Sequence, residues 1–233
     1  MAWLLLEDGT KYPGELFGAE REALGEAAGL IGRKPRLLLA TGNAHKVVEL
    51  KTMLGDRFDV RTMREMGIAL DVEETGETFE ENALLKAQAL FDLCHCATLA
   101  DDSGLCVDAL GGRPGVYSAR YGGEGLDDAG RTLRLLCELK GVTARGAKFV
   151  SAIAYYANDG DCFTVRGECA GRIADAPHGA GGFGYDPIFY VPEYGMTYSE
   201  MDPELKNRIS HRGVALARFC ERLKQTREKD GSQ

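Results

Sequence analysis

The 233-residue chain has no long apolar run, and no segment approaches the ~18 residues needed to span a bilayer. Its first six residues are followed at once by Glu7 and Asp8, so they lack the length and the basic flank of a signal peptide. These absences predict a cytoplasmic protein with no membrane partner.

The chain also has fewer basic than acidic residues. The 28 Lys and Arg residues stand against 36 Asp and Glu residues, which gives a formal net charge of −8. Non-specific binding to nucleic acid requires a broad basic surface that neutralises phosphates. The sequence therefore predicts no nucleic-acid partner, although a small basic pocket for phosphates stays compatible with this charge.

Cysteine and glycine give two further constraints. The seven cysteines are scattered and form no CxxC pair, so neither a zinc ribbon nor a disulfide framework is expected. The 30 glycines follow no collagen-like period. Their excess predicts turns and loops in which the backbone comes close to a ligand.

Residues 1–33 differ from the rest of the chain. Residues 3–14 predict a strand, an Asp8-Gly9 turn and a second short strand, and a helical or loop stretch leads into a linker over 29–34. Within residues 1–28, LLLEDGTKYPGELFGAEREALGE resembles the extreme N-terminus of the carbamoyl-phosphate synthase small subunit, without that protein's glutaminase nucleophile. We therefore expect an N-terminal extension over 1–33 and one domain over 34–233.

From residue 35 onwards, strand and helix patterns alternate around a central hairpin. The expected strands cover 36–40, 58–62, 98–100, 149–157 and 162–169, and the expected helices cover 45–54, 78–94, 125–140, a segment that begins at 202–203, and about 214–227. The segment 78–81 matches a capping box, with Thr78 as N-cap and Glu81 reaching back. This order predicts an α/β, or α+β, fold with a mixed sheet.

The segment ATGNAHK, residues 40–46, runs from an expected strand through a glycine turn into a helix. A helix N-terminus offers free N–H groups and the positive end of its dipole. Lys46 is unfavourable there unless an anion lies nearby, so the segment predicts a phosphate site. It is not a Walker A loop, and a plain strand–helix turn with a solvated Lys46 is the alternative.

Two acidic segments, Glu73-Glu74 and Asp101-Asp102-Ser103-Gly104, are candidates for metal binding. The aspartates come directly after an expected buried strand, where active sites of α/β sheets collect. Carboxylate oxygens suit Mg²⁺, which usually takes one or two of them together with substrate phosphates. The alternative is that Asp102 and Ser103 only stabilise a turn.

Three further segments could carry chemistry. Lys86 lies on the helix that begins after Thr78 and matters only if its face is turned toward the phosphates. The loop GGFGYDP, residues 181–187, offers aromatic surfaces that suit a purine base, although it could also be a surface loop with a buried aromatic plug. Lys206 and the segment SHRG, residues 210–213, supply donors to carbonyl oxygens, or a helix cap with exposed basic neighbours.

Taken in order, the blocks ATGNAHK, EETGETFEENALLKA, ADDSGL, PGVYSARYGG, GGFGYDPIF and ISHRG resemble the inosine triphosphate pyrophosphatase family, the XTP/dITP diphosphatases. The resemblance covers about residues 36–224. It implies an elongated mixed central sheet flanked by helices, with an active-site cleft between two lobes, and usually a homodimer. It also implies Mg²⁺-dependent hydrolysis of deaminated purine nucleoside triphosphates (ITP, dITP, XTP) to the monophosphate and pyrophosphate.

The same resemblance implies roles for individual residues. Asp102 is the candidate base and, with Glu74 and possibly Glu73, a metal ligand. The implied substrate-binding residues are Thr41, Gly42, Asn43, Ala44, His45, Lys46, Lys86, Ser103, Phe183, Gly184, Tyr185, Asp186, Lys206, His211 and Arg212. Among these, the residues of the 40–46 segment and Lys86 would hold the triphosphate. Residues 183–186 would bind the base and the sugar, and Lys206, His211 and Arg212 would contact the edge of the base.

Two other interpretations stay open from the residues alone. One is a Maf-like nucleotide pyrophosphatase that acts on modified pyrimidine nucleotides. The other is a non-catalytic nucleotide-binding or regulatory module, tied to carbamoyl-phosphate synthesis through the N-terminal segment. The SHRG and GGFGYDP blocks favour the purine enzyme, and the intact carboxylates and lysines favour catalysis.

Overall fold

The computed structural model describes residues 2–5, 11–14, 34–123, 125–158 and 161–230. Strands β1 (Ala2–Leu5) and β2 (Lys11–Gly14) pair antiparallel in a two-stranded sheet of their own, which confirms the two expected strands. The turn at Asp8-Gly9 and the segment 15–33, with most of the carbamoyl-phosphate synthase resemblance, lie outside the described residues.

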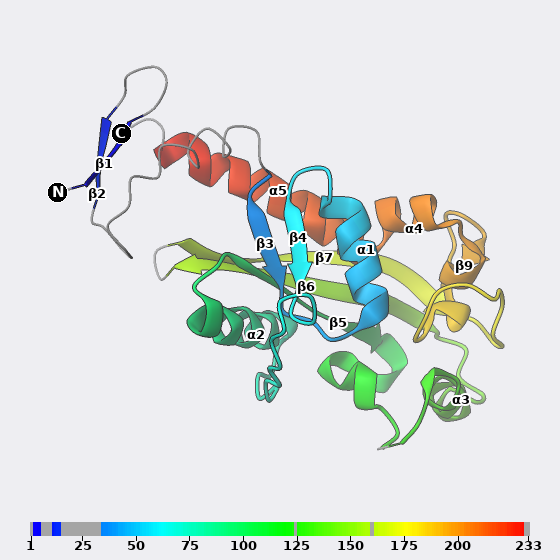
Figure 1. Cartoon of the computed structure of the whole chain (residues 1–233). Helices are drawn as coiled ribbons and strands as arrows, with labels where there is room; N and C mark the ends of the chain where they lie inside the picture. Colours follow the sequence, from blue (N-terminus) through cyan, green and yellow to red (C-terminus); the bar gives the residue numbers. More distant parts are fainter. Residues whose placement is uncertain (1, 6–10, 15–33, 124, 159–160, 231–233) are drawn as a thin grey trace.

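The described part of the domain is built on a seven-stranded mixed sheet with the order β4-β3-β5-β6-β7-β8-β9 (Figure 1). The strands are β3 (Arg36–Leu39), β4 (Asp59–Thr62), β5 (Thr98–Val107), β6 (Gly146–Asn158), β7 (Asp161–Ile173), β8 (Phe189–Val191) and β9 (Met196–Thr197). Strands β4, β3 and β5 run parallel, and all later pairings are antiparallel. The expected α/β fold with a mixed sheet is confirmed.

Helices cover both faces of this sheet (Figure 1). They are α1 (Ala44–Leu54), α2 (Phe79–Cys94), α3 (Asp128–Glu138), α4 (Pro203–Ile209) and α5 (His211–Asp230). Leu37, Leu39 and Leu99 pack with α1 and α5, whereas Leu38 and Ala100 pack with α2 on the other face. This division follows from the strand geometry, because successive side chains point to opposite faces.

A third group of buried apolar residues, which includes Leu135, Phe149 and Phe189, forms the core of a second lobe around α3, β8 and β9. The first lobe contains α1, α2, β3 and β4. The long strands β5, β6 and β7 run through both lobes (Figure 1). The molecule thus has the two-lobed arrangement expected from the sequence.

Strand β5 differs from its expected length. The sequence predicts that it ends at residue 100, but it continues to Val107 because β6 pairs with it along the whole stretch. Asp101 and Asp102 are therefore interior strand residues, opposite Ile153 and Ala152, and not residues that follow a strand end. Their side chains consequently point to opposite faces of the sheet.

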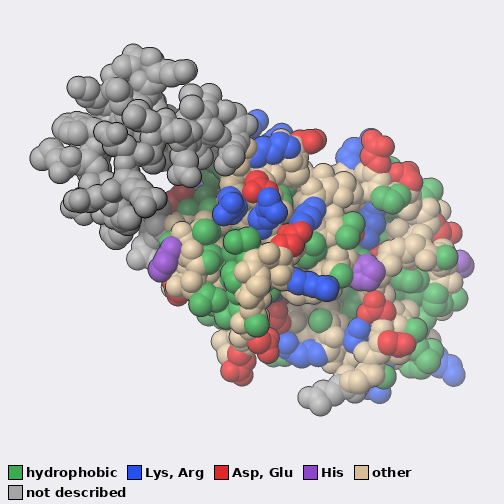
Figure 2. Space-filling model, viewed as in Figure 1, with side chains coloured by type: hydrophobic (Ala, Val, Ile, Leu, Met, Phe, Trp, Pro, Cys, Tyr) green, Lys and Arg blue, Asp and Glu red, His purple; other side chains and the backbone are tan. Residues whose placement is uncertain are grey.

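After β5 and a short turn comes the 3₁₀ helix η2 (Gly115–Arg120), in which the Ser118 carbonyl accepts from Tyr185 and Arg120 pairs with Glu74. On the face drawn in Figure 2, the described Lys and Arg side chains alternate with Asp and Glu side chains and form no broad basic surface.

Among the described residues, no helix combines the length and the apolar character that a membrane crossing requires.

Candidate active site

A cavity of about 590 Å³ lies between the two lobes. It is lined by every residue that the sequence analysis proposes for substrate binding and catalysis, and by the proposed metal ligands Glu74 and Asp102. Glu73 is exposed and is not among the residues that line the cavity. Of the two neighbouring glutamates, Glu74 is therefore the one in position to hold a metal ion.

The N-terminus of α1 forms one wall of the cavity. Asn43 is the N-cap residue, and its Oδ1 accepts hydrogen bonds from the backbone N–H groups of His45 and Lys46, at 3.0 and 3.1 Å. The Thr41 hydroxyl in turn accepts from the N–H of Asn43 at 3.2 Å. The sequence predicts free N–H groups here, but the cap already binds two of them, so an anion has to rely more on side chains such as Lys46.

Asp101 is the most heavily bonded carboxylate of the site, whereas the sequence analysis placed it only within a candidate metal-binding segment. Its oxygens accept from Arg212 at 3.2 Å and from Ser151 at 2.7 Å, and they form a 2.6 Å ion pair with Lys46. Burial opposes its ionisation, but the charges of Arg212 and Lys46 outweigh burial, so the pKa of Asp101 lies well below its usual value. Asp101 therefore stays ionised and joins α1 to α5.

Asp102 points to the opposite face, toward α2. Its Oδ1 accepts from the Lys86 ammonium at 2.7 Å, and Glu74 Oε1 accepts from the same ammonium at 2.8 Å. Burial raises the pKa of Asp102 above its usual value, against the opposing charges of Lys86 and Lys46. Burial also acts to raise the pKa of Glu74, but the hydrogen bond from Lys86 and the charge of Arg120 outweigh it, and the net shift is downward.

The donor set around Asp102 and Glu74 fits a magnesium ion. Asp102 Oδ2 is buried and has no hydrogen-bond partner, so this oxygen is available to a ligand. The described residues contain no group of three or more His, Cys, Asp or Glu side chains that could hold a metal ion. Two carboxylates are what Mg²⁺ ordinarily takes when substrate phosphates complete its shell.

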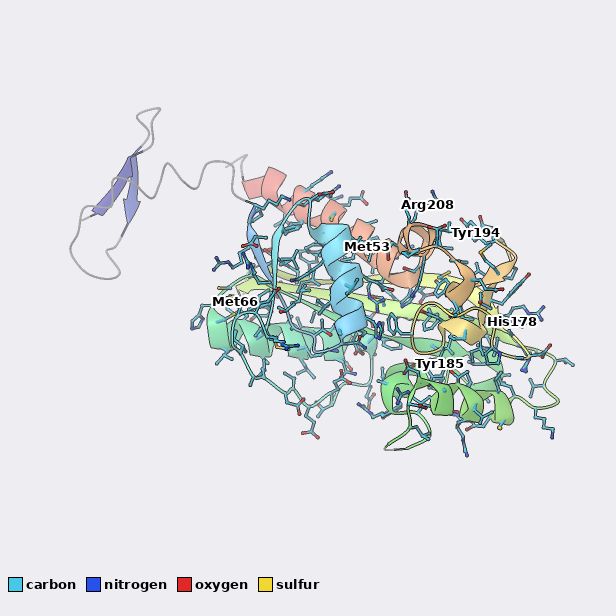
Figure 3. The ribbon with its side chains drawn as sticks, turned by 45° about the vertical axis from the view of Figure 1, so that its right-hand side comes forward. Met53, Met66, His178, Tyr185, Tyr194 and Arg208 are labelled. Atoms are coloured by element: carbon cyan, nitrogen blue, oxygen red, sulfur yellow. The ribbon has the colours of Figure 1, made fainter. Side chains whose placement is uncertain are left out.

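The second lobe supplies aromatic side chains to the cavity. The Phe183 ring is half-buried and stacks on His45, with 4.9 Å between ring centroids and 10° between the planes. Tyr185 is only 4% exposed, and its hydroxyl donates to the Ser118 carbonyl at 2.9 Å. Figure 3 shows Tyr185 beside the green segments that contain η2 and α3. Phe183 is thus the ring that a base can reach, and Tyr185 acts as the buried plug.

Asp186 and Lys206 organise the loop that carries Phe183. Asp186 Oδ2 accepts from the N–H of Phe183 at 2.9 Å and from the Lys206 ammonium at 2.6 Å. The Gly184 N–H donates to Asp128 of α3 at 2.7 Å. Asp186 Oδ2 is therefore occupied by bonds within the protein, and the loop is fixed against the second lobe.

Glu49 does not line the cavity but pairs with two residues that do, and the sequence analysis missed it. It accepts from Lys206 of α4 at 2.9 Å and pairs with Arg212 of α5 at 2.5 Å. Glu49 lies three residues after Lys46 on α1, so both share one helix face. That spacing is the sequence signal that could have found it, whereas its partners lie more than 150 residues away.

His211 and Arg212 lie in the first turn of α5, earlier than the helix start that the sequence predicts. The Ser210 hydroxyl accepts from the N–H of Gly213 at 3.2 Å, as a capping residue does. The imidazole of His211 stacks on Phe149 with centroids 4.7 Å apart, and its Nδ1 is buried without a partner. Burial holds the pKa of His211 well below its usual value, so this ring is neutral at neutral pH.

The fold and the cavity define an α/β protein with a deep site for a charged small molecule, ionic at one end and aromatic at the other. Comparison with known proteins agrees. The model of the Ham1 family matches residues 37–222. The chain belongs to the Ham1 family, as its sequence blocks predict.

Individual relatives match over most of their length. A dITP/XTP pyrophosphatase of Geobacillus kaustophilus is 48% identical over 192 residues, which are 81% of this chain and 94% of that protein. A dITP/XTP pyrophosphatase of Bacillus subtilis is 46% identical, over 80% of this chain and 96% of the relative. The solved Staphylococcus aureus Ham1 protein is 41% identical with a TM-score of 0.75, covering 82% of this chain and 99% of its own.

Proposed function

We propose that this protein hydrolyses deaminated purine nucleoside triphosphates, namely ITP, dITP and XTP, to the monophosphate and pyrophosphate with Mg²⁺ as cofactor. Membership of the family and the named relatives establish an enzyme of the nucleoside-triphosphate pyrophosphatase class. The observation that carries the proposal is that one cavity brings together Asp102, Glu74, Lys46 and Lys86 at one end and Phe183 at the other.

The ionic end suits a triphosphate. The ammonium groups of Lys46 and Lys86 both lie near the carbonyl oxygen of Asp101, at 3.5 and 3.1 Å, so two cations converge on one point of the cavity. Such fixed charges neutralise the negative charge that develops on a leaving pyrophosphate. Mg²⁺, held by Asp102 and Glu74, would add Lewis-acid stabilisation of the phosphate oxygens.

Asp102 is the group we assign to the attacking water. Hydrolysis at the α-phosphorus requires a water molecule in line with the departing pyrophosphate. The free Oδ2 of Asp102 can accept a hydrogen bond from that water and orient it. A carboxylate that also holds a metal ion is a weak base, so we expect orientation to matter more than proton abstraction.

Selectivity would arise at position 6 of the purine. Hypoxanthine and xanthine carry a keto oxygen there, whereas adenine carries an amino group. The unpartnered His211 Nδ1 and the remaining N–H of the Arg212 guanidinium are candidate donors to a keto oxygen. A site built on such bonds rejects the wrong partner by up to about 10⁴-fold, because its buried polar groups are then left unpaired.

The proposal also covers the setting of the enzyme. We propose a homodimer that works in the cytoplasm on free nucleotides, with residues 34–233 as the catalytic domain and 1–33 as an extension without activity of its own. The cavity of about 590 Å³ and the acidic net charge of −8 support a small-molecule substrate and no nucleic-acid partner.

A substrate panel tests the proposed function. With Mg²⁺ present, we expect pyrophosphate release from ITP, dITP and XTP at rates at least about 100-fold above those for ATP, because only the 6-keto purines pair with the donors of the site. Chelation by EDTA should abolish the activity. Preferred cleavage of dUTP or modified UTP would instead indicate a pyrimidine-directed enzyme, and no turnover of any triphosphate would contradict catalysis.

A further inference from the structure

The segment that carries Glu74, residues 71–77, lies outside the helices and strands of the described fold, yet it is tied down at one end. The N–H of Gly76 donates to the side-chain Oδ1 of Asn82 at 2.8 Å, and the N–H of Glu77 donates to Glu81 Oε2 at 2.7 Å. The same Glu81 carboxylate closes the capping box of α2, where it accepts from the N–H of Thr78 at 3.1 Å. The bond from Gly76 to Asn82 is not part of that box. It fixes the loop at Gly76, two residues after Glu74.

Gly76 approaches α2 as closely as its backbone allows. A Cβ atom at this position would lie 2.7 Å from Asn82 Oδ1 and 2.7 Å from the Cβ of Glu81. Real Cβ atoms do not come so near to other heavy atoms, so no larger residue fits without moving the loop. This contact therefore requires glycine at position 76 and a short side chain with a hydrogen-bond acceptor at position 82.

Asn82 is a poor choice for stability alone. Its side chain is fully buried, and its Nδ2 has no hydrogen-bond partner. An unpaired polar group in the interior opposes folding, and an apolar side chain of similar shape avoids that cost. Residues that break such a local rule are often kept for function, and here the function resides in Oδ1, which holds Gly76.

Asn82 and Lys86 lie four residues apart on α2, so they share one face of the helix. Lys86 contacts both Glu74 and Asp102. The same helix face thus binds the loop through Asn82 and reaches the loop's carboxylate through Lys86.

We propose that Asn82 is a positioning residue that holds the loop so that Glu74 stands beside Asp102 as the second ligand of a divalent cation. This inference rests on the proposed function, because it concerns the metal site assigned there. Residues that orient metal ligands typically change metal affinity by 10- to 100-fold when they are replaced. Asn82 would act in this way without touching metal or substrate.

The test measures Mn²⁺ binding to the free protein by electron paramagnetic resonance, since Mn²⁺ accepts the same carboxylate ligands as Mg²⁺. We expect Asn82→Leu to bind Mn²⁺ at least about tenfold more weakly than the wild type, with a Tm no lower than that of the wild type. Asn82→Asp keeps an oxygen at the acceptor position and should bind Mn²⁺ more tightly than the Leu variant.

Two further variants separate positioning from a general loss of structure. Gly76→Ala pushes the loop away from Asn82 and should weaken Mn²⁺ binding as Asn82→Leu does. Thr98→Val removes a buried β5 hydroxyl whose bonds go to the carbonyls of Ala87 and Tyr156, at 2.8 and 3.2 Å, and not to the Glu74 loop. This matched control should lower Tm and leave Mn²⁺ binding unchanged.

The outcomes distinguish this inference from the proposed function. If the wild type binds Mn²⁺ and Asn82→Leu binds it equally well, the positioning role of Asn82 is overturned while the metal site stands. If Asn82→Leu, Gly76→Ala and Thr98→Val all lower both the Tm and the affinity for Mn²⁺, Asn82 is merely structural. If the wild type binds no Mn²⁺, the metal site itself is rejected, and this inference with it.

Discussion

Replacement of Asp102 by Asn is expected to reduce the turnover of ITP by at least about 10³-fold, because orientation of the water and the charge of one metal ligand are lost together. The amide keeps the size of the side chain, and the lysines that face the triphosphate stay in place. Nucleotide binding should therefore remain measurable. Initial rates of pyrophosphate release give the first quantity, and isothermal titration calorimetry with ITP gives the second.

Asp108→Asn provides the matched control for this variant. Asp108 is the first residue after the strand β5 that carries Asp102, but it is exposed and does not line the cavity. The same chemical change at that position should leave turnover within about twofold of the wild type, as is usual for exposed sites. Turnover of Asp102→Asn within a few-fold of the wild type would show that the catalytic assignment is wrong.

Replacement of Arg212 by Ala is expected to produce the largest loss of stability, about 3–5 kcal/mol in the free energy of unfolding. Arg212 is 1% exposed and is paired with both Asp101 and Glu49. Its removal leaves Asp101 with Lys46 and Glu49 with Lys206 as the remaining cations. The loss of one partner from a buried ion-pair network is strongly destabilising. Urea denaturation at 25 °C measures the effect.

Arg218→Ala, on the same helix, is the control for this loss. Arg218 is exposed and donates to a backbone carbonyl, that of Arg166, so we expect a change below about 1 kcal/mol. If Arg212→Ala costs no more than this control, the ion pairs around Asp101 do not stabilise the packing of α1 on α5 as described.

The same variant also reports on base recognition. The ratio of kcat/KM for ITP to that for ATP does not depend on the fraction of enzyme that is folded, so it can be measured even on a weakened protein. We expect Arg212→Ala to lower this ratio, since a donor to the keto oxygen is lost or displaced. An unchanged ratio would move recognition of the base to His211 or another residue.

The sequence predicts those parts of the site that depend on local spacing. The capping box at Thr78 and Glu81 is present as predicted. The spacing also places Lys86 and Asn82 on one helix face, although it left open that this face is turned toward Glu74 and Asp102. Spacing of this kind acts within one or two helical turns, where the backbone geometry leaves little freedom. The approximate positions of most helices and strands follow from periodicity for the same reason.

The pairings that the sequence could not predict are those made across the fold. Glu49 meets Arg212 only because α1 and α5 pack on the same face of the sheet, and no local pattern specifies that contact. Asp101 and Asp102 are adjacent in sequence, yet they serve opposite faces because β5 continues past them alongside β6. The choice of Glu74 over Glu73 likewise depends on which side chain the loop turns inward.

Product analysis of the wild-type enzyme by ³¹P nuclear magnetic resonance tests the central claim most directly. Incubation with ITP and Mg²⁺ is expected to yield inosine monophosphate and inorganic pyrophosphate in equal amounts, with no inosine diphosphate at any time. Release of orthophosphate together with inosine diphosphate would place the cleavage at the γ-phosphorus. That result would contradict the assignment of Asp102, Glu74 and the two lysines to pyrophosphate release.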